Sequence, residues 1–337
     1  MTAATESNPQ STSASTASEP LPEELTMAVE AGREDAYFAL VDRLNAASVR
    51  KRFECYRDIE WDAPQMRIDP MDPHWESSRD RGLGKTDWYW SLPETTRREM
   101  GLGSVARFMF VGSIFENVLS RGLLQFASRL EAGSPEYRYA YHEVIEESHH
   151  SLMFREFVDR SGVAVQGLSS TMTAGADRVS GFGREFPELL FIFALGGEDP
   201  IDYAQRRALE EEADMHPLVE RISRIHVTEE ARHVSFARAY LRHNVPKLDK
   251  NRRHELAVAT PLILSQMAGL MMRPSQAFIE RYQIPQEAVD IAYTNNRDHK
   301  VRIQASLEKI RLLCDELELL PEQALDLWKQ YELWPEA

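Results

Sequence analysis

Two Glu-x-x-His pairs lie about eighty residues apart in this sequence, and each is embedded in a stretch whose residues favour helix. The first pair lies within residues 142–150 and the second within residues 226–233. A Glu and a His three residues apart project from one face of a helix, so both can bind the same metal ion. Two such helices, with one Glu from each of two further helices, form the dinuclear carboxylate site of a helical bundle. The pairs therefore predict several helices packed around a buried metal centre.

The rest of the sequence favours an all-α fold. Apolar residues recur at three- and four-residue spacing, Gly and Pro cluster between these stretches, and strand signals are scarce. Because 43% of the 337 residues are hydrophobic, the chain can bury a core. We therefore predict a ferritin-like helical bundle with additional helices. The expected helices cover residues 22–54, 94–130, 134–161, 186–213 with a break near Pro200, 217–243, 251–272, 286–296, 301–317 and 321–331.

Two segments outside these helices differ in composition. Residues 1–20 are mostly Ser, Thr, Ala, Glu and Pro and are expected to form a disordered tail, which leaves 21–337 as one domain. Residues 61–93 contain several Pro, Gly and Trp and are expected to form a long irregular segment that covers the bundle. Within it, residues 82–86 resemble the end of a phosphate-binding loop. However, Arg79 stands where that loop needs glycine, and no strand precedes it.

Charge and cysteine content narrow the choice of partners. The net charge of −15 argues against nucleic acid, because phosphate binding requires a basic surface. Cys55 and Cys314 have no neighbouring Cys or His at zinc spacing, and this sparse usage suits a reducing cytoplasm. The sequence shows no N-terminal apolar segment and no apolar run long enough to span a bilayer, so no membrane association is expected.

The second pair has an extra histidine one helical turn upstream. At about 100° per residue, His226, Glu230 and His233 lie within about 60° of one another around the helix axis. Three metal-binding side chains on one inward stripe are hard to explain by packing. The alternative interpretation is a surface helix that is merely rich in Glu and His. We take all three residues as candidate ligands.

The first pair can be read in two frames, Glu146 with His149 or Glu147 with His150. The stripe through Glu147 and His150 continues along more apolar residues, and the core face of a helix is its apolar face. We therefore select Glu147 and His150 as ligands. Glu146 and His149 are then expected on a solvated face, with His149 available to support a ligand, and Glu229 is expected on the outer face of the second helix.

A third carboxylate is found in the stretch 108–127. Its dominant helical face is apolar, and Glu116 interrupts that face. A buried carboxylate must be paired or bound to metal, because burying it alone is costly. The alternative is that Glu116 is exposed. We take it as a candidate ligand.

The fourth carboxylate follows the apolar run 189–195. Glu198 is the favoured ligand, and Asp199 is the alternative, either as a ligand or as the cap of a helix that starts at Pro200. Pro200 predicts a kink or a local π-turn, a distortion that is common at functional sites. Asp202, one turn later, could orient a ligand histidine.

The composition of the candidate set indicates the metal. Four carboxylates neutralise two divalent cations, and the histidines add donors without adding charge. Mixed carboxylate and imidazole ligation suits iron or manganese, whereas the absence of thiolates disfavours zinc fingers and iron–sulfur clusters.

In order and spacing, the candidate ligands resemble those of the p-aminobenzoate N-oxygenase (AurF-type) di-iron enzymes. That family adds a third histidine, here His226, to the ligand set of other ferritin-like oxygenases. The resemblance covers residues 116–233 and implies as metal ligands Glu116, Glu147, His150, Glu198, His226, Glu230 and His233. Within the family, the length and the Ser/Thr-rich N-terminus are most similar to the arylamine oxygenases of the chloramphenicol pathway.

This resemblance implies an O2-dependent monooxygenase that oxidises an aryl amine to a nitroarene through hydroxylamino and nitroso stages. The cofactor would be two iron ions, which form a peroxo-bridged intermediate with O2. Because the chain has no nicotinamide or flavin fingerprint, an external electron donor is expected. We also expect a homodimer. The narrower similarity implies that the substrate is the amine precursor of a nitroaryl antibiotic such as chloramphenicol.

Two other functions fit parts of the pattern. One is a different di-iron or iron–manganese oxidase or hydroxylase of ferritin-like fold, which would not require the third histidine. The other is a non-enzymatic helical interaction protein, which would not require three motifs with inward register. Both features are present, so the arylamine oxygenase is the favoured hypothesis.

Overall fold

The computed structural model describes residues 23–211 and 215–335, so the disorder expected for residues 1–20 lies outside the described part of the chain. Within the described residues no strand occurs, which confirms the all-α prediction. The long helices are α1 (Glu23–Arg50), α4 (Glu94–Ala127), α5 (Pro135–Ser161), α6 (Ser170–Glu185), α7 (Pro187–Glu211), α8 (Pro217–Asn244) and α9 (Lys250–Met272). The shorter ones are α2 (Cys55–Asp58), α3 (Asp87–Ser91), α10 (Gln276–Arg281), α11 (Gln286–Val289), α12 (Arg297–Ser306), α13 (Glu308–Glu316) and α14 (Glu322–Gln330).

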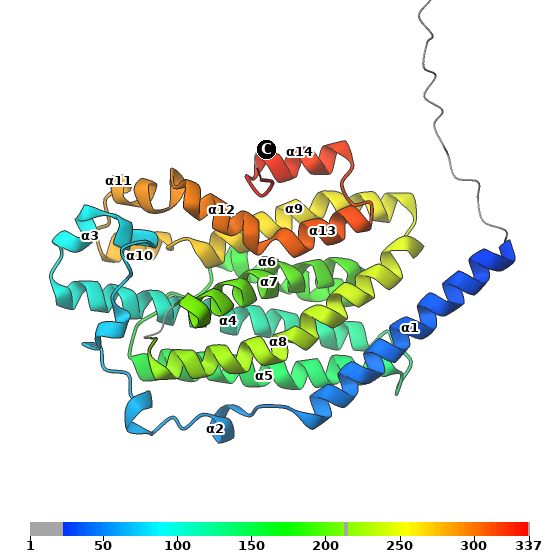
Figure 1. The fold of residues 1–337 in the computed structure, drawn as a ribbon, viewed down its shortest axis with the longest axis horizontal. Coiled ribbons are helices and arrows are strands. Elements are labelled where there is room, and N and C mark those ends of the chain that lie inside the picture. Colours follow the sequence, from blue (N-terminus) through cyan, green and yellow to red (C-terminus); the bar gives the residue numbers. More distant parts are fainter. Residues whose placement is uncertain (1–22, 212–214, 336–337) are drawn as a thin grey trace, which may run out of the picture.

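The centre of the molecule is a bundle formed by α4, α5, α7 and α8, which run alongside one another in Figure 1. Helix α4 packs on α5, and α7 packs on α8. Helix α6 covers α4 and α7, α9 lies against α7, and α1 crosses α5 and α8 obliquely. The two helices with the Glu-x-x-His pairs, α5 and α8, thus both face the interior of the bundle.

The ends of α5 and α8 are set by local sequence. Helix α5 begins after Ser134, whose side chain accepts a hydrogen bond from the Tyr137 N–H, and it ends at Gly162 with φ of +64°. Helix α8 starts with Pro217, which needs no hydrogen-bond acceptor for its nitrogen, and the His216 side chain accepts from the Leu218 N–H. These caps fix where each motif begins along its helix.

Helix α7 is continuous through Pro200, so the break expected there is wrong. A proline in a helix removes one hydrogen bond, but α7 is buried along this stretch and tertiary packing maintains it. The preceding Gly197 lets α7 approach α4 closely, because a Cβ atom at this position would lie 2.3 Å from the ring of Phe115. The neighbouring Glu198 is thereby brought into the bundle interior.

Helix α6 was not expected from the sequence. Its three glycines lower its intrinsic helix propensity, and its composition is polar. In the structure, Gly183 crosses α4 at Gly122 so closely that a Cβ atom would lie 1.9 Å from the Gly122 carbonyl oxygen. Close packing against α4 therefore compensates for the weak propensity of α6.

The C-terminal helices are more divided than expected. The predicted helix 286–296 consists of α11 followed by a π-helical turn, Asp290–Thr294. The predicted helix 301–317 is interrupted at Leu307, which separates α12 from α13. These elements lie outside the four bundle helices and contribute none of the candidate ligands.

The segment 61–93 is irregular, as predicted, and consists of short turns and α3 packed on the bundle. Trp75 is only 3% exposed, and its carbonyl oxygen would lie 1.6 Å from a Cβ atom at Gly101 of α4. The 3₁₀ turn Gly82–Lys85 follows no strand, and Lys85 forms an ion pair with Asp298. The structure therefore gives no support to a phosphate-binding loop here.

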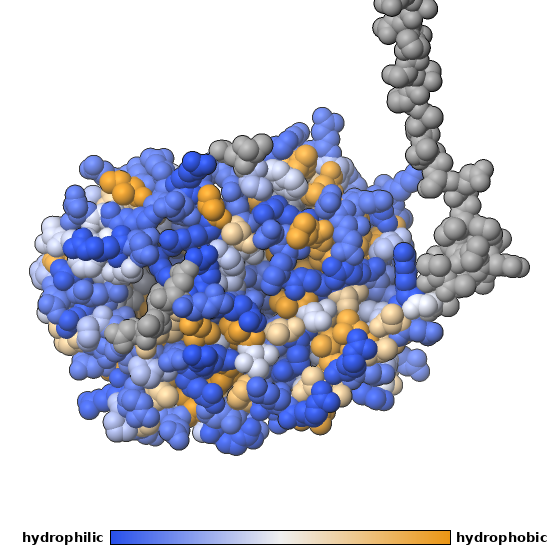
Figure 2. Space-filling model, viewed as in Figure 1, coloured by the Kyte–Doolittle hydropathy of each residue, from blue (hydrophilic) through white to orange (hydrophobic). Residues whose placement is uncertain are grey.

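Two segments, Glu94–Ala127 and Lys250–Arg281, are long and apolar enough to cross a membrane by length and composition alone. The expectation that the chain has no such run is therefore wrong. About half of the most apolar window of each is buried inside the protein, as in the core helices of a globular bundle. The face seen in Figure 2 is mainly hydrophilic with dispersed apolar residues. These two segments are weak evidence for a membrane association.

Candidate metal centre

The bundle brings all seven candidate ligands together in its interior. Helix α4 contributes one of them, α5 two, α7 one and α8 three, and none is more than 2% exposed. Several groups of three of these residues have donor atoms within 4.8 Å of one another, which is a spacing that can hold a metal ion. These residues are Glu116, Glu147, His150, Glu198, His226, Glu230 and His233.

Glu147 and Glu230 lie in the middle, between two histidines. His150 Nδ1 is 3.0 Å from Glu147 Oε2 and 3.1 Å from Glu230 Oε1. On the other side, His233 Nδ1 is 2.9 Å from Glu147 Oε1 and 3.0 Å from Glu230 Oε2. Each central carboxylate therefore contacts both histidines, and both histidines present Nδ1 to the centre. Carboxylates placed in this way can bridge two metal ions.

The remaining three candidates, His226, Glu116 and Glu198, lie close to one another beside the central carboxylates. His226 Nε2 lies 3.3 Å from Glu116 Oε1, 3.7 Å from Glu230 Oε1 and 4.0 Å from Glu198 Oε2. Glu116, Glu147 and Glu198 form one of the groups with closely spaced donor atoms. The third histidine therefore faces the same space as the carboxylates of α4 and α7, as its helical register predicts.

The choice between Glu198 and Asp199 is clear in this geometry. Glu198 points at the cluster, whereas Asp199 forms an ion pair with Arg238. Asp202 also lies outside the cluster and forms a 2.7 Å ion pair with Arg206. The expectation that Asp202 orients a ligand histidine is therefore wrong, because its carboxylate is held by the arginine one turn later on the same helix.

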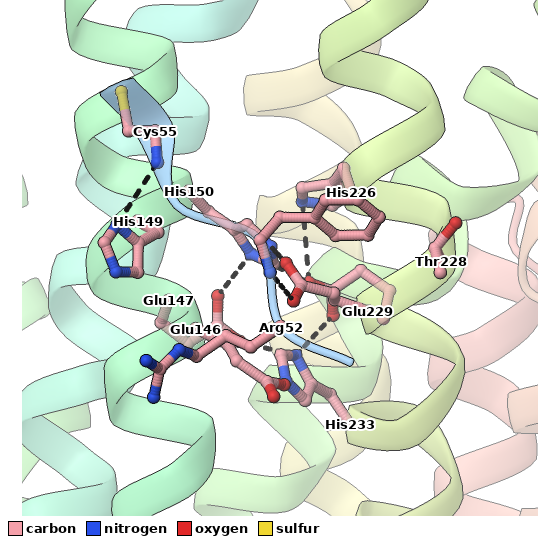
Figure 3. A network of polar contacts seen from close by, with 12 residues as sticks. Arg52, Cys55, Glu146, Glu147, His149, His150, His226, Thr228, Glu229 and His233 are labelled. Atoms are coloured by element: carbon pink, nitrogen blue, oxygen red, sulfur yellow. Dashed lines mark hydrogen bonds and ion pairs between the residues drawn. The ribbon is translucent and has the colours of Figure 1, made fainter. Parts of the chain in front are cut away.

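Glu146 and Glu229 are not on solvated faces, so that expectation is wrong as well. Both are fully buried, and each contacts a histidine of the opposite helix. Glu146 Oε2 is 2.8 Å from His233 Nε2, and Glu229 Oε2 is 3.0 Å from His150 Nε2 (Figure 3). The reason is that α5 and α8 pack side by side, so the residue before each central Glu points toward the neighbouring helix.

These two outer carboxylates orient the histidines. A carboxylate on the outer nitrogen fixes the ring and its tautomer and makes the inner nitrogen a better ligand. Arg232 Nη2 joins the two, at 3.0 Å from Glu146 Oε1 and 3.4 Å from Glu229 Oε1. A doubled Glu before each x-x-His, present in both motifs, is the sequence signal that could have identified them.

A segment after α1 covers the outer side of this network. The Phe53 N–H donates a 2.9 Å hydrogen bond to Glu229 Oε1, and the Cys55 N–H donates a 3.3 Å hydrogen bond to His149 Nδ1. Figure 3 shows this segment crossing in front of α5 and α8. His149 thus holds the segment after α1 in place, and it does not orient one of the candidate metal ligands.

Burial dominates the electrostatics of the cluster. It raises the pKa of Glu116 and of Glu198 well above the usual value, and neighbouring carboxylates raise both further. Burial also raises the pKa of Glu230, but the adjacent His233 and His226 outweigh it and hold that pKa well below the usual value. Burial lowers the pKa of His226 to about 4, so this imidazole is neutral near pH 7 and available as a ligand.

The donor set fits two divalent cations. Both carboxylate oxygens of Glu198 and the Oε2 of Glu116 are buried without a hydrogen-bond partner among the described residues. Buried polar atoms are almost always paired, and unpaired carboxylates are costly. Cations between these oxygens and the histidines would remove that cost. Carboxylate oxygens and imidazole nitrogens without thiolate are the ligands that iron and manganese favour.

Because Glu146 and Glu229 each contact a candidate ligand histidine, removing either carboxylate should weaken metal binding. Glu146→Ala should leave His233 without its outer partner and weaken metal binding about 10–100-fold, as expected for loss of a group that orients a ligand. Competition with a colorimetric iron chelator measures this. Asp159→Asn, an exposed carboxylate on the same helix, is the control. Unchanged metal affinity in Glu146→Ala would show that the contact with His233 is incidental.

Known proteins resemble this chain over most of its length. The family model of p-aminobenzoate N-oxygenase AurF matches residues 34–318, which include every bundle helix. An uncharacterized protein of Mycobacterium tuberculosis (strain CDC 1551 / Oshkosh) is 34% identical over 293 residues, covering 87% of this chain and 86% of its own length. An uncharacterized protein of Mycobacterium bovis (strain ATCC BAA-935 / AF2122/97) is 33% identical with the same coverage. No solved structure matches the chain.

Proposed function

The chain belongs to the p-aminobenzoate N-oxygenase family, and from this premise we propose that it is a di-iron enzyme that uses O2 to oxidise an aryl amine to a nitroarene. The observation that carries the proposal is the third histidine. His226 is fully buried and faces Glu116, Glu198 and Glu230, in addition to the two Glu-x-x-His pairs. A di-iron oxidase of the ordinary kind needs only four carboxylates and two histidines.

The role of the iron would be to activate O2 and transfer oxygen to the amine nitrogen. The protein would hold the two ions, exclude bulk water and position the amine. The ligand-orienting carboxylates Glu146 and Glu229, tied together by Arg232, would keep His150 and His233 in one orientation during turnover. The buried surroundings of the centre favour selective oxidation, because water has little access to it.

The electron balance requires a reductant. One amine and two O2 give one nitroarene and two water molecules when two electrons and two protons are supplied. The hydroxylamino intermediate supplies the electrons for the later oxidation, since hydroxylamine and O2 together balance the nitro product and water. We therefore propose that an external reductase or small reductant delivers one electron pair for each amine.

The substrate, the oligomeric state and the cellular compartment are proposed from the composition of the chain and from its resemblance to the family. The substrate is proposed to be the amine precursor of a nitroaryl antibiotic such as chloramphenicol, and the enzyme is proposed to act as a homodimer. Cys55 and Cys314 are both buried free thiols. Unpaired cysteines suit a reducing compartment, so we propose that the enzyme works in the cytoplasm.

Metal analysis and product analysis test the proposal. After anaerobic loading with Fe(II), we expect about two irons per chain from the ligand count. Given O2 and a reductant, the loaded protein should convert members of an aryl amine panel to hydroxylamino, nitroso and nitro products, which liquid chromatography with mass spectrometry identifies.

The same experiment can contradict the proposal. Binding of zinc alone, or of no metal after iron loading, would contradict the di-iron centre. Two bound irons with ring or side-chain hydroxylation, and with no N-oxygenated product from any amine, would instead favour a different di-iron oxygenase of the same fold. Metal-free protein incubated with the same amines and reductant is the control for uncatalysed oxidation.

A further inference from the structure

Glu143 occupies a position on α5 that corresponds to the position of His226 on α8. His226 precedes Glu230 by four residues, and Glu143 precedes Glu147 by four residues. Side chains at that spacing lie on the same face of a helix. Each bundle helix with a Glu-x-x-His pair therefore carries a further metal-binding side chain one turn upstream, a histidine on one helix and a carboxylate on the other.

Glu143 is buried beside the centre. It is 1% exposed, and its donor atom lies within 4.8 Å of donor atoms of Glu147 and His233, which also lie this close to each other. Another group with the same spacing consists of Glu116, His150 and His226. The two groups share no residue, so they can serve two different ions. In the second group the upstream residue is His226, and in the first it is Glu143.

A purely structural role does not account for Glu143. Its Oε2 is buried without a hydrogen-bond partner among the described residues, and the hydroxyl of Tyr139, one turn away on α5, also has none. A buried carboxylate that stabilises a fold is normally hydrogen-bonded or paired with a cation. A buried carboxylate with one unpaired oxygen, and with a donor atom within 4.8 Å of donor atoms of Glu147 and His233, is placed to bind a cation together with these two residues.

We propose that Glu143 is a metal ligand at the His233 end of the centre, where it takes the place that His226 takes at the other end. The inference rests on the proposed function only in that it needs a dinuclear metal centre; it does not depend on the amine chemistry. The ligand set then contains five carboxylates and three histidines.

One consequence concerns charge. Five carboxylates exceed the charge of two divalent cations by one, and the additional negative charge stabilises a more highly charged metal pair. A second consequence is asymmetry, since one ion has the neutral His226 and the other has the anionic Glu143. Two inequivalent ions allow substrate or O2 to approach one of them preferentially.

Iron binding tests the inference without any measurement of turnover. Glu143→Gln keeps the shape of the side chain and removes its charge. The variant and the wild-type protein are loaded with Fe(II) under anaerobic conditions, and bound iron and its release to a chelator are measured. We expect one of the two irons to leave the variant more than about 100-fold faster, beyond the effect of removing a group that only orients a ligand. Mössbauer spectra of ⁵⁷Fe-loaded protein should show that one of two ferrous signals shifts.

Two further variants sharpen the test. Glu143→His replaces the carboxylate with the donor found at the corresponding position of α8, and we expect it to retain two irons better than Glu143→Gln. A hydrogen-bonding role would give the opposite order, because Gln keeps hydrogen-bonding capacity and shape. Glu188→Gln is the control, since Glu188 is a buried carboxylate on α7 outside the cluster.

The results separate the inference from the proposed function. Wild-type protein that binds no iron would overturn both. Wild-type protein with two irons, together with Glu143→Gln that also holds two irons with unchanged release and spectra, would overturn the inference alone. If Glu143→Gln does not fold, a crystal structure of the iron-loaded wild-type protein decides: a Glu143 oxygen at bonding distance from iron supports the inference, and a Glu143 side chain bound to no metal overturns it.

Discussion

Glu147→Ala and Glu230→Ala should each abolish amine oxidation and remove most of the bound iron. Each of these carboxylates lies within 3.1 Å of both His150 and His233, so each can serve both metal ions. Removing one would delete a carboxylate that could bind both ions and a negative charge that would balance the cations, so the binding of both ions should weaken. We expect the loss of activity to exceed about 100-fold, the upper end of the effect of removing a group that only orients a ligand.

The measurement combines iron content per chain with product formation from a responsive aryl amine. Thermal unfolding of the metal-free proteins shows whether a variant folds. Asp159→Asn should behave as wild type, because its side chain is exposed on α5. Glu146→Ala and Glu229→Ala cannot serve as neutral controls, since these carboxylates contact His233 and His150, which are candidate ligands. Wild-type turnover in Glu147→Ala would mean that the bridging position belongs to another residue.

Helical periodicity predicted which candidate ligands would share a helix face. His226, Glu230 and His233 share one face because 3.6 residues complete a turn, and this holds whatever the surroundings of the helix. The more apolar stripe also selected Glu147 and His150 over the adjacent frame, and the structure places both in the cluster. Helical periodicity is therefore sufficient where a single face of a helix carries the chemistry.

The roles of Glu146 and Glu229 could not be predicted by the same argument. Choosing one inward stripe assigns the adjacent residues to solvent, which is correct only when a helix has one buried side. Helix α5 contacts α4, α8 and α1, so it is buried over much of its circumference. The periodicity of apolar residues along one helix does not predict where the neighbouring helices pack against it. The same limit left Glu143 unassigned, although it precedes the selected ligand by one turn.

Local propensity also failed where tertiary contacts decide the structure. The glycines of α6 and Pro200 of α7 both argue against helix by propensity, yet both segments are helical. Gly183 and Gly197 permit close approach of α6 and α7 to α4, and burial compensates for their conformational freedom. The Pro/Gly/Trp composition of 61–93, by contrast, predicted irregular backbone correctly, because those turns are specified locally.

His226→Ala should separate metal binding from catalysis. His226 is fully buried, and its Nε2 lies 3.3 Å from Glu116 and 3.7 Å from Glu230. The contacts of 3.1 Å or less among Glu147, Glu230 and the other two histidines do not involve it. Six of the seven ligands predicted from the sequence remain in the variant, which is the number in an ordinary di-iron site. We therefore expect His226→Ala to keep a substantial share of its iron but to lose amine oxidation by about 10–100-fold.

His233→Ala is the comparison that gives this result its meaning. His233 lies within 3.0 Å of both central carboxylates and is held from outside by Glu146, so its removal should release metal outright. Iron content and rapid-mixing absorption spectra after exposure of the Fe(II)-loaded proteins to O2 distinguish the two variants. A His226→Ala protein with wild-type turnover and spectra would show that this histidine does not bind iron. The main argument for N-oxygenation over another di-iron oxidation would then be lost, because the third histidine is the feature that an ordinary site lacks.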